Sequence, residues 1–132
     1  MSYANKQLVR MTWKVDLTAA SSWLFRLPYN EAGGATQGKI VNAGVMLTTT
    51  VAGDQAAPTF QLGTASDADA YVKVTIPDGT AAPDSFDVTD DTDAIISGAI
   101  PSGGVVKASI TAATDSGTAA GAGYAFVDIY VW

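Results

Sequence analysis

Residues 124–132, at the end of the chain, form a strongly apolar stretch. At a period of two residues, one side of this stretch is aliphatic and the other is aromatic except for one carboxylate. A strand with one side in water alternates polar and apolar residues, whereas here both sides are apolar. The pattern predicts a strand in the middle of a sheet, with its outer side covered by something else, such as another subunit. The residues of the aromatic side are Tyr124, Phe126, Asp128, Tyr130 and Trp132.

Residues 8–17 give a second clear strand pattern, with apolar residues alternating with polar ones. The pattern predicts a strand with one wet or interfacial side, on which Arg10 and Lys14 lie. We expect this strand to pair in antiparallel fashion with residues 124–132 in one sheet, as a jelly roll requires. Asp128 lies between two aromatic residues and needs a partner, because an isolated buried carboxylate is costly. Arg10 or Lys14 on the neighbouring strand is the natural candidate.

Further strand patterns are separated by turn signals rich in Pro and Gly, about 8 to 12 residues apart, and no apolar pattern of period 3.6 is long enough for a helix. The chain is therefore expected to be all-β, a single β-sandwich domain over residues 1–132, jelly-roll-like, with its first and last strands adjacent and central. Residues 1–6 are expected to form a short flexible arm, residues 30–38 a partner-contacting loop, and residues 112–123 a flexible loop. A bulge or bend is expected at residues 42–44. The other expected strands are 23–27, 40–51, 59–63, 71–76, 85–89, 94–96 and 105–111.

The composition excludes several classes of function. The 132 residues include no Cys and no His, which excludes thiolate nucleophiles, imidazole bases and ordinary zinc sites. The net charge of −6 argues against nucleic acid as a partner. No apolar run approaches the roughly 18 residues of a membrane helix, and the start lacks the apolar segment of a signal peptide. We therefore expect synthesis in the cytoplasm, no export signal and no membrane partner.

The charges are unevenly distributed along the chain, and the aspartates are the only candidates for a site. The first strands are basic, whereas residues 67–93 contain many aspartates. Asp67, Asp69 and the group within residues 84–93 offer oxygen ligands of the kind calcium prefers, but their spacing does not match an EF-hand. Asp16 and Asp128 are the carboxylates considered for a glycosidase, and a structural role is expected for both. We expect no catalytic, metal or cofactor site.

Aromatic residues suggest sugar binding as an alternative. Trp13, Trp23 and Trp132 fall inside apolar strand patterns, where aromatic residues more often fill a core than stack on sugars. A carbohydrate-binding module therefore stays an alternative interpretation.

Three stretches carry a resemblance to a known family. They are residues 45–50 leading to 60–64 and 67–69, residues 110–123, and residues 127–132. In these stretches the chain resembles small virion proteins of tailed bacteriophages, namely capsid decoration or head-auxiliary proteins. The resemblance implies a jelly-roll-like fold and a homotrimer that binds the major capsid protein on the outer capsid surface and stabilises the shell without enzymatic activity. A tail-fibre or baseplate module is a further alternative. The structural or interface candidates are Arg10, Lys14, Tyr124, Phe126, Asp128, Tyr130 and Trp132.

Calcium removal is expected to leave the fold unchanged, because the aspartate spacing does not form a dedicated calcium loop. The melting temperature measured with and without EGTA should be the same. A fall of several degrees on adding EGTA would show that Asp67, Asp69 or the aspartates of residues 84–93 bind a structural cation.

Overall fold

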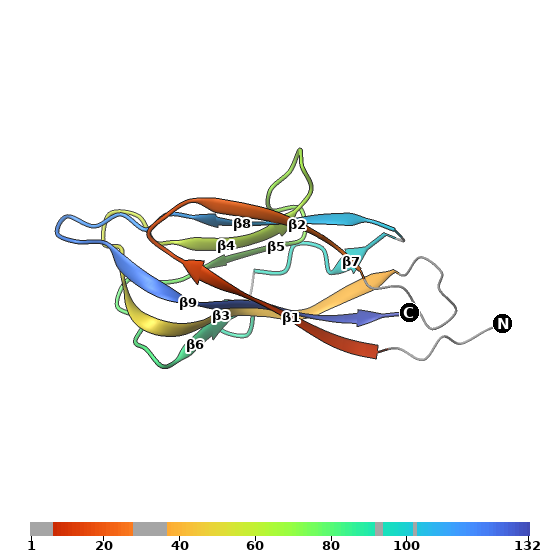
Figure 1. Ribbon diagram of the computed structural model, residues 1–132, viewed down its shortest axis with the longest axis horizontal. Helices are drawn as coiled ribbons and strands as arrows, with labels where there is room; N and C mark the ends of the chain where they lie inside the picture. The colour runs from red at the N-terminus through yellow and green to blue at the C-terminus, as the bar shows by residue number, and fades with distance from the viewer. Residues whose placement is uncertain (1–6, 28–36, 92–93, 102) are drawn as a thin grey trace.

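In a computed structural model, the structure describes residues 7–27, 37–91, 94–101 and 103–132. Over these residues the chain contains no helix and forms two antiparallel sheets, which lie in two layers (Figure 1). Sheet A has the strand order β1-β9-β3-β6, with the short β7 also paired to β3, and sheet B has the order β2-β8-β4-β5. The strands are β1 (Gln7–Asp16), β2 (Ser21–Arg26), β3 (Gly38–Ala52), β4 (Thr59–Gly63), β5 (Val72–Thr75), β6 (Ser85–Asp87), β7 (Ala99–Ile100), β8 (Val105–Thr111) and β9 (Ala120–Val131).

The strand pairs are nested around one central hairpin. The β4–β5 pair is innermost, and β3–β6, β2–β8 and β1–β9 follow outward. Successive pairs alternate between the two sheets, so the chain passes repeatedly from one layer to the other. The predicted all-β class is confirmed, and the two layers are compatible with a β-sandwich.

The predicted pairing of the first and last strands is confirmed, but their predicted position is only half right. Strand β1 pairs with β9 in antiparallel fashion, and Arg10 lies opposite Asp128. Strand β9 lies inside sheet A between β1 and β3, whereas no described strand pairs with the other side of β1. Strand β1 is therefore an edge strand of sheet A, and of the two only β9 is interior.

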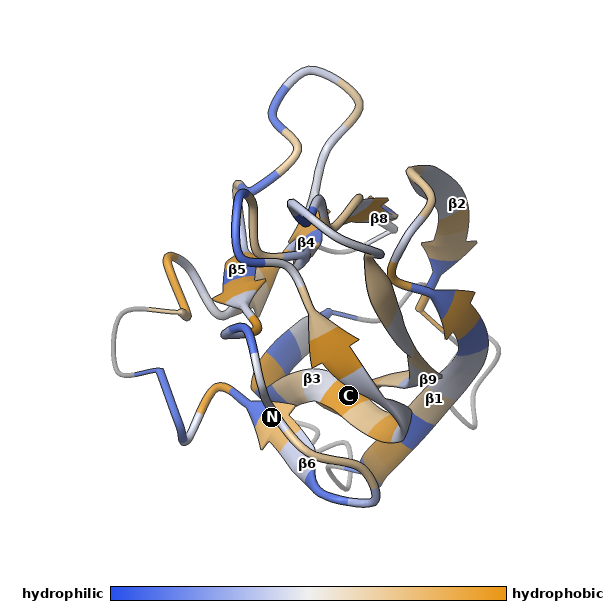
Figure 2. Ribbon diagram, turned by 90° about the vertical axis from the view of Figure 1, so that its left-hand side faces the viewer, coloured by the Kyte–Doolittle hydropathy of each residue, from blue (hydrophilic) through white to orange (hydrophobic). Residues whose placement is uncertain are grey.

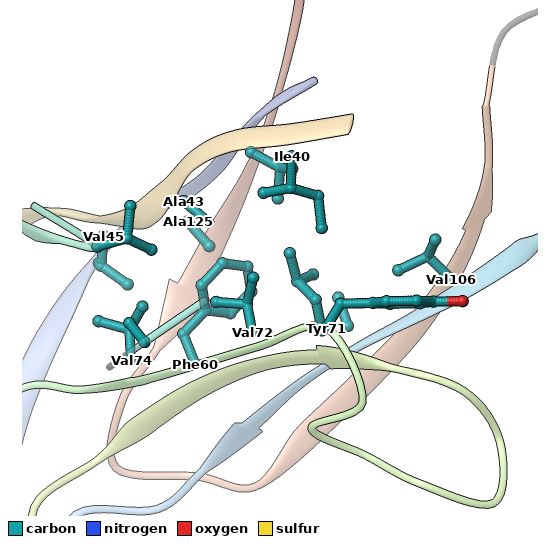
Figure 3. Packing of buried hydrophobic residues seen from close by; sticks show 14 of the residues in the cluster. Ile40, Ala43, Val45, Phe60, Tyr71, Val72, Val74, Val106 and Ala125 are labelled. Atoms are coloured by element: carbon teal, nitrogen blue, oxygen red, sulfur yellow. The ribbon is translucent and has the colours of Figure 1, made fainter. Parts of the chain in front are cut away.

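One hydrophobic core fills the space between the sheets. The aliphatic side of β9 faces it through Ala125, Val127, Ile129 and Val131, and sheet B contributes side chains such as the fully buried Phe60 (Figure 3). The alternation seen in residues 124–132 therefore correctly separates the core side of β9 from its outer side.

Aromatic rings line the inner side of the two edge strands β1 and β2. The Trp13 ring centroid lies 5.3 Å from the centroids of both Trp23 and Phe25, and Trp23 stacks on Phe60 at 6.2 Å. The rings of Trp13, Trp23 and Phe25 are partly buried against the core, in line with the expectation that Trp13 and Trp23 pack instead of binding a ligand. The Trp23 indole nitrogen is buried without a hydrogen-bond partner in the described residues.

Several predicted boundaries were wrong, most clearly at the start of β9. Residues 120–123 were expected to be loop, but they are strand, and their small side chains allow close approach to β3. A Cβ atom on Gly123 would lie only 2.0 Å from the Met46 carbonyl oxygen, so a larger residue would separate the strands. The run of small residues therefore permits a tight strand pair and does not mark a flexible loop.

Short and irregular elements account for the other differences. Residues 94–96 make an isolated bridge between Ile95 and Val72 and are not a strand, while the two-residue β7 was not predicted. The irregularity expected at residues 42–44 begins earlier, between Ile40 and Asn42, and two more follow before Ala52. Residues 1–6 and most of the loop 30–38 lie outside the described residues. Among the described residues, no helix is long and apolar enough to cross a membrane.

The Phe60→Ala variant is expected to be less stable by about 3–5 kcal/mol, because it removes a fully buried ring and leaves a cavity under Trp23. Gln61→Ala is the matched control on the same strand, since Gln61 points to the other side of sheet B, and it should cost less than about 1 kcal/mol. Urea denaturation of both variants measures the difference. Equal losses for the two variants would contradict the assignment of the core side of β4.

Candidate interaction surface

The outer side of sheet A collects most of the residues singled out from the sequence. Because Val9, Met11, Trp13 and Val15 face the core, the alternate residues of β1 face outward, and the same alternation holds along β9. The strand register then brings the two outer rows side by side. We call this surface the β1–β9 face, and it comprises Leu8, Arg10, Thr12, Lys14, Tyr124, Phe126, Asp128 and Tyr130.

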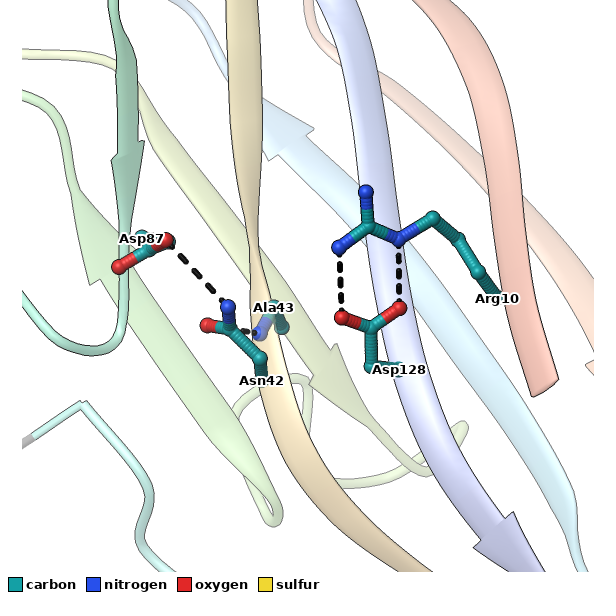
Figure 4. Close-up of polar contacts among 5 residues, drawn as sticks. All are labelled: Arg10, Asn42, Ala43, Asp87 and Asp128. Carbon is teal, nitrogen blue, oxygen red and sulfur yellow. Dashed lines mark hydrogen bonds and ion pairs between the residues drawn. The ribbon is translucent and has the colours of Figure 1, made fainter. Parts of the chain in front are cut away.

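Asp128 and Arg10 form a bidentate ion pair at the centre of this face. Arg10 Nε donates to Asp128 Oδ1 at 2.6 Å, and Arg10 Nη2 donates to Asp128 Oδ2 at 2.7 Å (Figure 4). The Asp128 side chain is 12% exposed, whereas that of Arg10 is 50% exposed. The hydrogen bonds to this carboxylate raise the pKa of Arg10. The expected partner for Asp128 is thus found, and it is Arg10 and not Lys14.

Arg10 also covers Phe126. The central carbon of its guanidinium lies 4.6 Å from the centroid of the Phe126 ring, at a distance typical of a cation–π contact. Phe126 is only 2% exposed although it lies on the outer side of the sheet. We expected the whole aromatic side of β9 to need cover from outside the domain. For Phe126 this expectation is wrong, because the Arg10 side chain of the same chain covers the ring.

Two more polar residues extend the ion pair into a row across sheet A. Asn42 on β3 lies opposite Asp128, and its Nδ2 donates to Asp87 Oδ2 at 3.3 Å (Figure 4). Burial raises the pKa of Asp87, but hydrogen bonds from Thr89, Asn42 and the Asp90 backbone outweigh it and leave the pKa below its usual value. Asp128 and Asp87 on the outer side of sheet A are thus already hydrogen-bonded.

The remaining apolar groups of the face lie exposed at its two ends. Leu8, Tyr124 and Tyr130 are 58%, 44% and 37% exposed. The register places Lys14 beside Tyr124, and Lys39 of β3 beside Tyr130. Each exposed tyrosine therefore has a lysine as its cross-strand neighbour. The pairing of Lys39 with Tyr130 could not be predicted from the sequence, because the two residues are more than 80 positions apart.

Trp132 differs from the other sequence candidates. It follows β9, and its backbone nitrogen and oxygen bond to the backbone of Gln37 at 3.3 and 3.2 Å. Its side chain is partly buried. We assign Trp132 to the extension of the strand ladder and leave it out of the β1–β9 face.

The acidic residues lie apart from one another or in contacts with loops in the described part of the chain. No group of three or more potential ligands among those residues is placed to hold a metal ion. Asp54 and Ser116 instead join two loops, because Ser116 Oγ donates to Asp54 Oδ2 at 2.6 Å and Ser116 N to Asp54 Oδ1 at 2.7 Å. These hydrogen bonds lower the pKa of Asp54. This contact had no signal in the sequence, since the two residues are 62 positions apart.

Asp16 and Asp128 cannot act as a glycosidase pair. Arg10 lies opposite Asp128, and Asp16 is six residues further along β1, or roughly 20 Å at the rise of a strand. The two carboxyl groups of a glycosidase are at most about 9.5 Å apart. The Asp16 carboxylate accepts hydrogen bonds from Thr18 N and Thr18 Oγ1, which lower its pKa and close the turn after β1.

Comparison of the chain with protein-family models, curated proteins and solved structures gives no match.

Breaking the central ion pair should destabilise the protein asymmetrically. Asp128→Ala frees a half-exposed guanidinium and should cost about 1–3 kcal/mol, whereas Arg10→Ala leaves a buried carboxylate without its partner and should cost about 2–4 kcal/mol. Denaturant unfolding measures both values, with Lys14→Ala as the exposed control on the same strand at about 0.5 kcal/mol or less.

The double variant Arg10→Ala/Asp128→Ala separates the pair from its surroundings. It should cost clearly less than the sum of the two single variants, because the second change removes a group that the first left unpaired. Strictly additive losses would contradict a stabilising ion pair between Arg10 and Asp128.

Proposed function

We propose that this chain is a non-enzymatic structural protein of a bacteriophage virion, which binds the outer capsid surface as a homotrimeric decoration protein and stabilises the shell. Its partner is then the major capsid protein and its location is the virion surface. The proposal begins with the family resemblance of the sequence. Features of the fold and of the β1–β9 face support it independently.

The strand order supports a jelly-roll assignment. When the two-residue β7 is set aside, eight strands form four nested antiparallel pairs, and successive pairs alternate between two sheets. A long hairpin rolled up into two sheets has this arrangement, which is the double Greek key of a jelly roll. Such domains recur in viral shells, although a fold by itself does not define a function.

The single observation that carries the binding proposal is that each exposed tyrosine of the β1–β9 face has a lysine as its cross-strand neighbour. Tyr124 lies beside Lys14 and Tyr130 beside Lys39, while Asp128 and Asp87 on this side are both hydrogen-bonded. Tyrosine provides a large contact area with little loss of side-chain entropy, and it is enriched at interfaces. The lysines select a partner surface with acidic groups, so the protein is expected to bind an acidic region of the shell.

A carbohydrate-binding module is the second candidate. Tyr124 and Tyr130 lie on one side of β9 and are six residues apart, a separation of roughly 20 Å that suits several sugar rings in a row. A tail-fibre or baseplate module stays a further alternative, which differs in its position on the virion.

Capsids that lack the protein provide the test. Wild-type protein should add to them and raise their resistance to heat, whereas Tyr124→Ser/Tyr130→Ser and, separately, Lys39→Glu should bind at least about tenfold more weakly. Val105→Ser is the control, because Val105 is an exposed apolar residue on sheet B. Wild-type protein that fails to bind capsids but binds glycans would favour the carbohydrate module.

A further inference from the structure

Two opposite flanks of the molecule carry complementary groups. Strands β1 and β2 are the edges of sheets A and B on one flank, and β6 and β5 are the edges on the other, as the view along the strands shows (Figure 2). The basic flank carries the exposed residues Leu8, Lys14, Leu24 and Arg26, together with Arg10, whose guanidinium is already paired with Asp128 of the same chain. The acidic flank carries Asp84, Asp87, Asp90, Asp91, Ile95 and Ile96.

Backbone hydrogen bonds hold the acidic flank against both sheets. The Asp84 carbonyl accepts from Leu47 N and the Val88 amide donates to Ala43 O, so this segment follows β3 at the edge of sheet A. The Ala94 carbonyl accepts from Lys73 N, which places residues 94–96 along the edge of sheet B. The aspartates and isoleucines are therefore fixed parts of one flank.

We propose that copies of this chain associate head to tail, with the basic flank of one copy against the acidic flank of the next. The occupant of each flank is thus a second copy of this chain. The inference deepens the proposed homotrimer, on which it rests, by naming the surfaces that form it. An interface between two different surfaces generates a ring when the rotation closes, whereas a two-fold interface would bring like charges together.

The strand register aligns charged groups at the same height on the two flanks. In sheet A, Lys14 lies opposite Tyr124, Tyr124 opposite Met46, and Met46 opposite Ser85. Lys14 is therefore level with Ser85, the neighbour of Asp84. A rotation about an axis along the strands keeps each residue at its height, so it brings Lys14 of one copy to the level of Ser85 of the next, one residue from Asp84.

The same alignment holds for the exposed aliphatic groups of sheet B. Trp23 is in register with Ala108, Ala108 with Leu62, Leu62 with Val72, and Val72 with Ile95. Leu24 follows Trp23 and Ile96 follows Ile95, so these two residues are also level with each other. Leu24 is 65% exposed and Ile96 is 57% exposed. One rotation therefore pairs a cation with a carboxylate in sheet A and two aliphatic side chains in sheet B.

Two charged residues depart from the pattern of the flanks. Asp16 lies at the end of β1, but its carboxylate accepts both hydrogen bonds from Thr18 and is turned into its own loop. Lys73 lies on β5, at the sheet B edge of the acidic flank. Neither residue is at the level of Lys14 and Asp84 in sheet A.

Cysteine cross-linking tests the contact directly, because the chain has no native cysteine. Lys14 and Asp84 lie three strand spacings apart within one chain, or about 14 Å, which is too far for an internal disulfide. Lys14→Cys/Asp84→Cys should therefore link copies to one another and give covalent species larger than a dimer on a non-reducing gel. Leu24→Cys/Ile96→Cys should do the same through sheet B.

Control variants separate this contact from other modes of association. The single variants Lys14→Cys and Asp84→Cys should stay unlinked, and so should Lys107→Cys/Asp84→Cys, because Lys107 lies on the inner strand β8. Disulfide dimers of Lys14→Cys alone would reveal a two-fold contact and overturn the proposal. Absence of linking in both cysteine pairs while the wild-type protein is oligomeric would also overturn it.

Charge reversal supplies a second measurement without cross-linking. Lys14→Glu and Asp84→Lys should each weaken self-association at least about tenfold at low salt, and the double variant should regain most of the loss. Light scattering at micromolar concentration reads the mass, and circular dichroism checks the fold. Losses that persist in the double variant would contradict the pairing. A wild-type protein that is monomeric in solution would contradict the proposed oligomer. Capsid binding through Tyr124 and Tyr130 has its own test, the addition of protein to capsids that lack it.

Discussion

The position of β9 inside sheet A is the constraint on which the rest of the structure depends. An interior strand needs hydrogen-bonding neighbours at both edges, and here β1 and β3 supply them over nearly its whole length. Its aliphatic side closes the core against sheet B, and its outer side holds Asp128 and Phe126, both of which Arg10 of β1 covers. Small residues at positions 120–123 let β3 approach the first part of the strand. One strand thereby connects the core, the edge strand β1 and the exposed β1–β9 face.

Much of this arrangement could be predicted from the sequence, because alternation with a period of two reports directly which side of a strand is buried. It located β1, β4, β8 and the apolar part of β9, and the isolated carboxylate at Asp128 indicated a basic partner on the neighbouring strand. What could not be predicted depends on contacts between distant residues. Examples are Lys39 beside Tyr130, the loop contact of Asp54 with Ser116, and the strand character of residues 120–123. Each of these is visible only when two distant segments are placed side by side.

The distribution of charge gives the surfaces of the molecule different chemical character. The strands exposed at one flank carry cations, β6 and the segments on either side of it carry carboxylates at the other flank, and the carboxylates of Asp128 and Asp87 on the outer side of sheet A are hydrogen-bonded within the chain. Such an arrangement leaves a protein of net charge −6 with a face that attracts acidic partners and with flanks that attract each other. In the proposed assembly, the flanks join the copies through Lys14 at the β1 edge of the β1–β9 face and leave Tyr124, Tyr130 and Lys39 of each copy free to bind the shell.

Electron cryo-microscopy of phage particles that contain the protein tests this account most directly. The account predicts density of three-fold symmetry on the outer surface of the capsid, with Tyr124 and Tyr130 directed toward the shell and the segment 84–91 of each copy next to β1 of its neighbour. Density for the chain in the tail or baseplate, or on the capsid with the β1–β9 face turned toward solvent, would contradict it.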